Sequence, residues 1–140
     1  MSTRVPATVK PPHTFAHRGA RAQAPENTLE AFTLALRLGA TGLESDVWLT
    51  ADGEAVLDHD GVVGRRPRRR VIGTTRRDEL PPHIPTLDDL YATCGTDMQV
   101  SLDVKDPAAF DRVLAVARAA GGGALGNLWL CHPRWEQVAA

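Results

Sequence analysis

The stretch from Gly42 to Thr50 constrains the fold most, because it is apolar and β-branched yet carries two carboxylates. Side chains on a strand alternate between its two faces, so Glu44 and Asp46 point the same way, roughly 7 Å apart along the strand. Two like charges on a buried face repel each other and cost desolvation energy unless a cation lies between them. The stretch therefore predicts a buried strand with a charged site, and a solvated edge strand is the alternative.

A hairpin signal follows this strand and predicts which residue faces the carboxylates. Asp52-Gly53 is a strong two-residue turn signal, and residues 55–60 have the pattern of a returning strand. With Asp52 and Gly53 as the central turn residues, Asp46 falls opposite His59. Directly opposed residues have Cβ atoms about 4.5–5.5 Å apart. The hairpin is therefore expected to place an imidazole beside the carboxylate pair.

Strand-like and helix-like segments alternate along the chain. The predicted strands are residues 14–16, 42–50, 99–105 and 127–132. The predicted helices begin at the caps Asn27, Thr86 and Asp106 and end at Gly39, Gly95 and Gly121. Such alternation predicts an α/β fold with a parallel sheet and helical crossovers. Polar residues at the ends of three strands lie where such sheets and barrels place their functional sites.

A second polar pair repeats the arrangement of the first. Asp103 and Lys105 lie two residues apart on a predicted strand and share a face. If these strands are neighbours in a barrel, Glu44, Asp46 and Asp103 converge on one point. Three carboxylates without a cysteine ligand suit Mg²⁺ or Ca²⁺ better than zinc or copper. Histidines and basic residues around a hard cation indicate phosphoryl chemistry, and a plain ion pair between Asp103 and Lys105 is the structural alternative.

Seven short motifs in a fixed order resemble the glycerophosphodiester phosphodiesterase family. They are His17-Arg18-Gly19, Pro25-Glu26-Asn27-Thr28, Glu44-x-Asp46, Thr50-x-Asp52-Gly53, His59-Asp60, Ile84-Pro85-Thr86-Leu87 and Asp103-x-Lys105. Each motif alone is weak, whereas the ordered set is highly specific. The resemblance is strong from Phe15 to Lys105 and fades by Trp129.

The resemblance implies a (β/α)₈ barrel with a small hairpin insertion after its second strand. It also implies hydrolysis of glycerophosphodiesters to glycerol 3-phosphate and an alcohol, with a divalent cation, an acid–base pair and phosphate contacts. The matching residues are Glu44, Asp46 and Asp103 as metal ligands, His17 and His59 as the acid–base pair, and Arg18 and Lys105 as substrate contacts. The family more often has glutamate at position 103. Related toxin-type phospholipases of the same barrel have aspartate there, so a phospholipase D-type activity is an alternative.

Length limits what this resemblance implies. A (β/α)₈ barrel typically needs about 250 residues, and these 140 residues supply four of the eight strands. The expected fold is the N-terminal part of a TIM barrel at residues 13–140, with a flexible arm at 1–12 and an insertion at about 51–85. Open barrel edges predict self-association. A catalytically inactive half-barrel that acts as a binding or assembly module is the alternative function.

Composition excludes several other classes of protein. Hydrophobic residues make up 43% of the chain and the formal net charge is −1, which favours a soluble globular protein and gives no general reason to expect nucleic acid as a partner. No run approaches the ~20 apolar residues of a membrane span, and no signal peptide is expected, so the expected location is the cytoplasm. Seven arginines between residues 65 and 77 predict an exposed loop that attracts anionic substrates. Polyanion binding is the alternative for this loop.

Overall fold

The computed structural model describes residues 12–134 and residue 136, so the arm expected at 1–12 lies outside the described residues except for its last position. Four parallel strands form the main sheet in the order β1-β2-β6-β7, and β3 pairs with β2 in antiparallel orientation. Their bounds are β1 Phe15–His17, β2 Gly42–Leu49, β3 Ala55–Leu57, β6 Gln99–Val104 and β7 Leu128–Cys131. The predicted α/β fold with a parallel sheet is confirmed.

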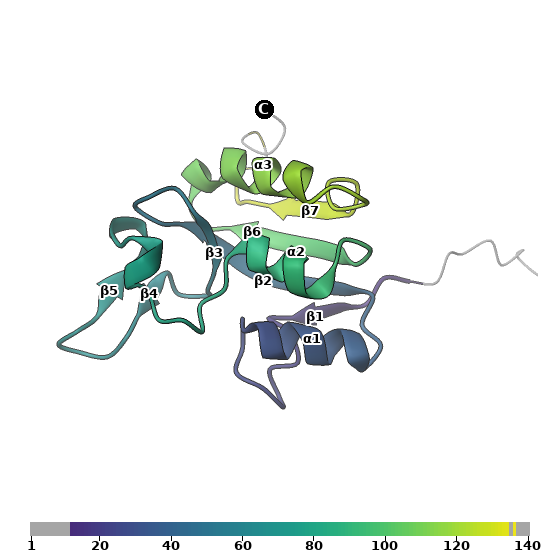
Figure 1. Ribbon diagram of the computed structural model, residues 1–140, viewed down its shortest axis with the longest axis horizontal. Helices are drawn as coiled ribbons and strands as arrows, with labels where there is room; N and C mark the ends of the chain where they lie inside the picture. The colour runs from purple at the N-terminus through teal and green to yellow at the C-terminus, as the bar shows by residue number, and fades with distance from the viewer. Residues whose placement is uncertain (1–11, 135, 137–140) are drawn as a thin grey trace, which may run out of the picture.

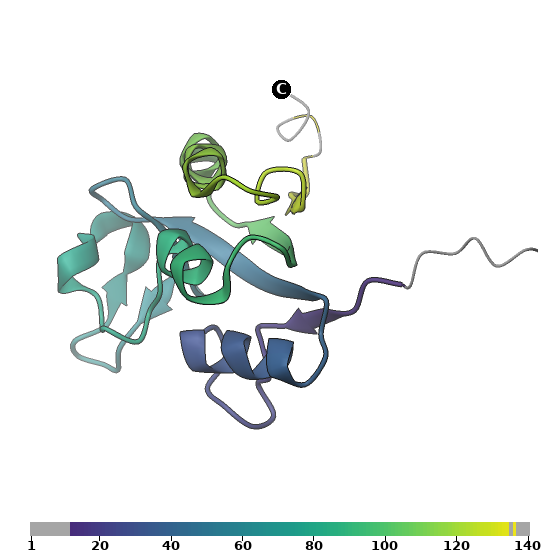
Figure 2. The same cartoon turned by 45° about the vertical axis from the view of Figure 1, so that its right-hand side comes forward.

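Three α-helices lie on the same side of this sheet, which we call the covered face (Figures 1 and 2). Their bounds are α1 Leu29–Arg37, α2 Leu87–Cys94 and α3 Phe110–Ala120. Alternate residues of β2 and β6 point to this face and form the main core, namely Leu43, Val47, Val100, Leu102 and Val104. Ser45 of β2 also points to the covered face, whereas Glu44, Asp46, Ser101 and Asp103 point to the opposite, uncovered face. The period-two alternation of the strands thus separates the core from the carboxylates.

The uncovered face is concave at the amino end of the strands. Phe15 of β1 and Trp129 of β7 belong to the two edge strands, yet their ring centroids lie 6.3 Å apart in an edge-to-face arrangement. Gly42 makes room between them, because a Cβ atom at this position would lie 2.8 Å from the Phe15 ring. The indole Nε1 of Trp129 also donates a hydrogen bond to Oε1 of Gln99, at 2.8 Å. The sheet therefore curls toward the face that the helices leave uncovered.

The helix boundaries follow the capping signals with one correction. Thr86 forms the predicted capping box with Asp89, and the helix α2 ends at Gly95 as expected. The prediction that Asn27 caps the first helix is wrong, because Thr28 is the N-cap and its Oγ1 accepts from the amide of Ala31 at 3.2 Å. Asn27 instead adopts a left-handed backbone conformation with φ 55°. None of the helices within residues 12–134 and 136 is long and apolar enough to cross a membrane.

The hairpin after β2 has a different register from the predicted one. Val47 pairs with Leu57, and the amide of Asp58 donates to the carbonyl of Asp46 at 3.1 Å, so Asp58 and not His59 lies opposite Asp46. The turn contains three residues, 51–53, and ends at Gly53 with φ 84°. A type I turn closed by a left-handed glycine is the second commonest hairpin loop, and it shifts the pairing by one residue.

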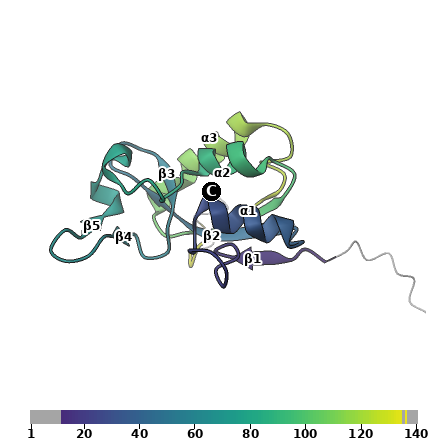
Figure 3. The ribbon, with the colours of Figure 1, turned by 60° about the horizontal axis from the view of Figure 1, so that its bottom comes forward.

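The stretch from Gly61 to Pro85 contains a small unit of its own. The strands β4 (Val62–Val63) and β5 (Arg70–Val71) form a two-stranded sheet, followed by the 3₁₀ helices η1 (Ile72–Thr74) and η2 (Arg77–Glu79). A third 3₁₀ helix, η3 (Pro107–Ala109), leads into α3. A second small core anchors the unit on β2 and β3 and consists of Val56, Val63, Ile72, Leu80 and Ile84, with Trp48 against it. Figure 3 shows this unit beyond the end of β2.

Candidate active site

All predicted site residues except His59 lie in, or directly after, three neighbouring parallel strands. In the parallel register, His17 of β1 lies beside Glu44 of β2, and Asp46 of β2 lies beside Asp103 of β6. Lys105 directly follows β6, and its amide donates to the carbonyl of Val47 at 3.1 Å. Residues from segments nearly 90 positions apart therefore meet along one edge of the uncovered face.

His17 and Glu44 form the first pair in this row. Nε2 of His17 lies 3.5 Å from Oε2 of Glu44, and the imidazole is about half exposed. The pKa of Glu44 is raised, first because burial penalises the carboxylate and second because Asp46 repels it, whereas His17 opposes this shift. The carboxylate is thus held where an additional positive charge would stabilise it.

Arg18 is positioned by a strained backbone. It has φ 57°, its amide donates to the carbonyl of Glu44 at 2.8 Å, and its carbonyl accepts from the amide of Asn27 at 3.0 Å. Gly19 follows with φ 79°, and a Cβ atom there would lie 2.7 Å from the backbone of Ala31, which explains the glycine in this motif. These contacts fix the direction in which the guanidinium leaves the backbone.

The guanidinium of Arg18 bridges two acidic residues. Its Nη1 donates to Oε2 of Glu26 at 2.7 Å, and its Nε lies 3.9 Å from Oδ2 of Asp46. The pKa of Arg18 is raised mainly by the hydrogen bond to Glu26, so the guanidinium stays charged. Its Nε is buried and has no hydrogen-bond partner within the described residues. One donor of Arg18 is therefore left for a further ligand.

Lys105 joins the carboxylates of the two central strands. Its Nζ lies 2.6 Å from Oδ2 of Asp103 and 3.5 Å from Oδ1 of Asp46. The pKa of Lys105 is raised, first by the hydrogen bond to Asp103. The pKa of Asp46 is also raised, because the burial of its side chain outweighs the attraction of Lys105, His59 and Arg18.

His59 approaches the row from the hairpin although the predicted register is wrong. Its Nδ1 lies 2.6 Å from Oδ1 of Asp60. The positive charge of a protonated His59 opposes the rise in the pKa of Asp46. The chain turns after Asp58, whose Oδ2 accepts from the amides of Asp60 and Gly61 at 3.1 and 2.9 Å. This turn, and not strand pairing, brings the imidazole near the carboxylates.

The chemistry of the donor set fits a hard divalent cation. Oε2 of Glu44 and Oδ2 of Asp46 are buried and lack hydrogen-bond partners among the residues that the structure describes. Unpartnered buried carboxylate oxygens are costly and mark a place where a cation is needed. Within the same residues, no three His, Cys, Asp or Glu side chains already group closely enough to hold a metal. Lys105 stands between Asp46 and Asp103, so the assignment of these three carboxylates as metal ligands stays a prediction.

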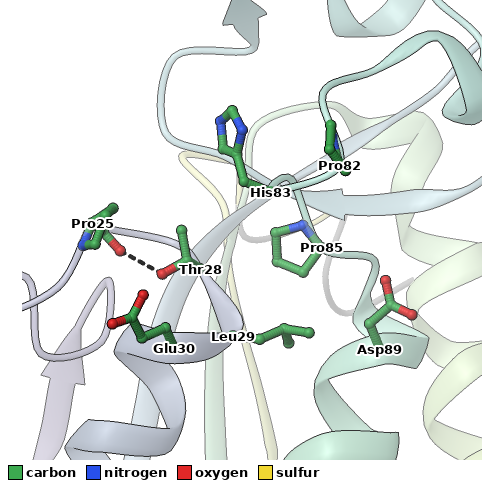
Figure 4. A pocket seen from close by; sticks show the side chains of 8 residues that line it. All are labelled: Pro25, Thr28, Leu29, Glu30, Pro82, His83, Pro85 and Asp89. Carbon is green, nitrogen blue, oxygen red and sulfur yellow. Dashed lines mark hydrogen bonds between the residues drawn. The ribbon is translucent and has the colours of Figure 1, made fainter.

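Two adjoining hollows open near the candidate site, and His59 lines one of them. One has a volume of about 430 Å³ and is lined by residues from three loops, including Asn27, Asp58, His59 and His83. The other, of about 540 Å³, is drawn in Figure 4 and has the prolines Pro25, Pro82 and Pro85 and the side chain of Leu29 on its walls. The two hollows share Pro25, Thr28 and His83. Together they offer space for a substrate group that extends away from the row of charges.

Asn27 is a candidate functional residue that the sequence analysis assigned only to helix capping. Its side chain is 4% exposed, and its Oδ1 accepts from the hydroxyl of Ser45 at 2.8 Å. Its Nδ2 is buried without a partner within the described residues, and Asn27 lines the 430 Å³ hollow. The signal that could have identified it is the pair of adjacent capping residues, Asn27 and Thr28, of which a helix needs one.

The fold and the site define an α/β protein with acidic, basic and imidazole groups at the carboxyl ends of its parallel strands. The model of the glycerophosphoryl diester phosphodiesterase family matches residues 17–107, and the chain belongs to this family. The matched range includes every residue of the predicted site.

Curated relatives carry the corresponding names. The chain is 36% identical over 109 residues to glycerophosphodiester phosphodiesterase 1 of Homo sapiens, with 65% of this chain and 33% of the relative covered. It is 54% identical over 51 residues to the glycerophosphodiester phosphodiesterase of Caldanaerobacter subterraneus, with 36% of this chain and 21% of the relative covered. The chain thus spans a third or less of the length of these relatives.

Solved structures are similar over most of the chain. The glycerophosphodiester phosphodiesterase of Thermotoga maritima has a TM-score of 0.79 and 30% identity, covering 89% of this chain and 55% of its own. A phosphodiesterase of Oleispira antarctica in complex with the product sn-glycerol-3-phosphate has a TM-score of 0.79 and 26% identity, covering 91% of this chain and 60% of its own.

Proposed function

We propose that residues 13–140 form the N-terminal part of a TIM (β/α)₈ barrel, about four of its eight strands, with an insertion at about 51–85. The parallel strands follow one another in chain order, and all three α-helices lie on one side of them, which is typical of a barrel wall. The 6.3 Å approach of the Phe15 and Trp129 rings supports a sheet that curves toward its uncovered face.

We infer that the site serves metal-dependent hydrolysis of a glycerophosphodiester to glycerol 3-phosphate and an alcohol. The observation that carries this proposal is the pair of buried oxygens on Glu44 and Asp46 that have no hydrogen-bond partner within the described residues, flanked by Arg18 and Lys105. Carboxylates bind a hard cation, and the basic side chains bind a phosphodiester. The product bound to the similar Oleispira antarctica phosphodiesterase is sn-glycerol-3-phosphate, the product that we propose for this site.

Glu44, Asp46 and Asp103 would hold the divalent cation, Mg²⁺ or Ca²⁺. When bound, this ion supplies positive charge to a non-bridging phosphate oxygen. Arg18 holds one side of the phosphodiester through its unpartnered Nε, while its ion pair with Glu26 keeps the guanidinium in place. Lys105 holds the other side and stays protonated, since the carboxylates beside it raise its pKa.

His17 and His59 form the proposed acid–base pair. One imidazole takes the proton from the attacking hydroxyl, and the other gives a proton to the oxygen of the leaving alcohol. Attack by water gives glycerol 3-phosphate directly, whereas attack by the glycerol hydroxyl gives a cyclic glycerol phosphate that a water molecule then opens. Asp60 accepts at Nδ1 of His59 and so leaves Nε2 of the same ring to exchange the proton. Oε2 of Glu44 lies 3.5 Å from Nε2 of His17, so Glu44 acts on this ring through its charge and leaves Nδ1 of the ring to exchange the proton.

The test is turnover of glycerophosphocholine by the chain with added Mg²⁺ or Ca²⁺. We expect EDTA to abolish activity, and His17→Ala and His59→Ala each to reduce kcat by about 10²–10⁴-fold. His13→Ala, outside the site, is the matched control and retains activity. Retained turnover in EDTA and in both site variants would refute the proposal, and faster cleavage of lysophosphatidylcholine would favour the phospholipase D-type alternative.

A second candidate is a catalytically inactive binding or assembly module. It is favoured by the uncovered face, where the large apolar side chains of Phe15 and Trp129 are 36% and 52% exposed. A chain that unfolds cooperatively and self-associates, yet does not turn over glycerophosphocholine with either metal, would support this module. A monomeric and active chain would exclude it.

A further inference from the structure

The loop between β4 and β5 carries a cluster of arginines that the proposed reaction does not use. Arg65, Arg66, Arg68 and Arg69 are all exposed, and we call these four residues the arginine tip. Figures 1 and 3 show that their loop projects away from the sheet, at the end where β2 and β3 meet. The tip therefore carries its charges on a loop that projects from the sheet.

The tip differs from the arginines that follow it in sequence. Arg70 lies 3.8 Å from Glu79, Arg76 lies 3.4 Å from Asp78, and Arg77 lies 3.7 Å from Asp89. Within residues 12–134 and 136, the four guanidinium groups of the tip form neither an ion pair nor a hydrogen bond. Their positive charge is thus available to a partner, whereas that of the later arginines is already matched.

The β4–β5 loop that carries the four arginines is anchored at both ends by buried residues. Val63 and Ile72 at the two ends of the loop are buried in the second core, and the amide of Ile72 donates to the carbonyl of Gly61 at 2.9 Å. Gly61 packs so closely on Trp48 that a Cβ atom would lie 2.5 Å from the indole. The amide of Arg68 also donates to the carbonyl of Arg65 at 2.8 Å, which closes the turn.

The arginine tip and the rest of the chain carry opposite net charges. Its formal net charge is −1 with the four tip arginines included, so the remainder of the chain carries a formal net charge of −5. A long polyanion that lies along the body would meet this negative charge. A flat anionic surface touches only what projects, and its potential decays within about 10 Å at moderate salt.

We propose that the arginine tip docks the protein on the surface of an anionic phospholipid bilayer. Each basic residue near such a surface adds favourable electrostatic energy, and four of them on one turn act together. Val71, next to the loop, is 52% exposed and adds an apolar contact at the interface. Nucleic acid fits less well, because residues 61–73 contain no aromatic side chain on which a base could stack.

Docking would also orient the candidate site. His59 and Asp60 lie immediately before β4 in the chain, so the loop and the acid–base group share one end of the molecule. Docking at the tip turns this end toward the lipid. The inference concerns binding and does not depend on whether the site turns over a substrate.

The experiment is co-sedimentation of the full chain with vesicles of phosphatidylcholine alone or of phosphatidylcholine with phosphatidylglycerol. We expect binding only to the anionic vesicles, with an affinity that falls as salt rises. The quadruple variant R65Q/R66Q/R68Q/R69Q should bind these vesicles at least about 100-fold more weakly. Arg21, Arg37, Arg118 and Arg134 are exposed, and their combined replacement by glutamine gives a control with the same net charge.

The control variant should bind as the wild type does, and circular dichroism should show that both variants fold. Equal loss in the two variants would overturn the proposal, because net charge and not the tip would then decide binding. Absence of wild-type binding to anionic vesicles would also overturn it. Tighter binding of the wild type to duplex DNA than to these vesicles, at equal phosphate concentration, would identify a nucleic acid partner instead.

Discussion

The two faces of β2 and β6 are built from alternate residues of the same strands and have opposite properties. On the covered face, Leu43 and Leu102 are buried against the helices. On the uncovered face are the carboxylates of Glu44, Asp46 and Asp103, and the first two each contain a buried oxygen that has no hydrogen-bond partner in the described part of the chain. One face contributes stability through burial, whereas on the other face burial raises the pKa of Glu44 and of Asp46 and so disfavours their charged forms. We therefore expect the uncovered face to serve binding and not folding.

The largest expected effect comes from the covered face. Leu102→Ala removes a side chain that is 0% exposed and should lower the free energy of unfolding by about 2–5 kcal/mol, because it leaves a cavity. Asp103→Asn alters the next residue of the same strand and should change it by less than about 1 kcal/mol, since the ion pair with Lys105 is partly exposed. Urea denaturation of both variants measures their free energies of unfolding. Equal losses of stability would contradict the contrast between the two faces.

Removing the buried charge of Asp46 on the uncovered face should change the free energy of unfolding by less than Leu102→Ala does, and should raise it. Burial raises the pKa of Asp46, so its charged form costs stability, and Asp46→Asn removes this cost. Lys105 keeps Asp103 and Arg18 keeps Glu26 as partners, so neither cation is stranded. We expect Asp46→Asn to raise the free energy of unfolding by up to about 1 kcal/mol and to abolish turnover. A loss of more than 1 kcal/mol in urea denaturation would contradict this assignment.

The sequence was sufficient to predict the strands of the main sheet, because alternation is a local property. Glu44 and Asp46 share a face with Asp103 as predicted, since strands of one parallel sheet fix which positions lie side by side. The hairpin register was wrong by one residue, because Asp52-Gly53 is compatible with both a two-residue and a three-residue loop. Only the packing of Leu57 on the covered face decides between the two registers.

Other features depend on tertiary contacts that leave little trace in sequence. The strands β4 and β5 have two residues each, too short for any periodic pattern, and their core includes Val56 and Leu80 from outside them. Asn27 follows a capping pattern, but its Oδ1 accepts a hydrogen bond from the hydroxyl of Ser45 on β2. The place of His59 depends on a turn held by the carboxylate of Asp58, which no pairing rule predicts.

The smallest expected effect comes from Asp52, a carboxylate that accepts hydrogen bonds. It tests whether burial, and not the presence of a carboxylate alone, makes a charged form costly on the uncovered face. Asp52 lies in the hairpin turn, where its Oδ1 accepts from the hydroxyl of Thr50 at 2.7 Å and from the amide of Arg77 at 2.9 Å. These hydrogen bonds lower the pKa of Asp52 below its ordinary value of 3.8, so the charged form stabilises the fold, the reverse of Asp46.

A lowered pKa fixes the pH dependence of this contribution. The stabilisation by Asp52 is present above pH 3.8 and is lost as the pH falls through the lower pKa of the folded state. The wild type should therefore have a slightly higher Tm than Asp52→Asn at pH 7, and the two values should converge well below pH 3.8. Asp97→Asn, at an exposed carboxylate, is the control and should show no such convergence. A Tm difference between wild type and Asp52→Asn that grows on acidification would mean that hydrogen bonding does not separate the two kinds of carboxylate.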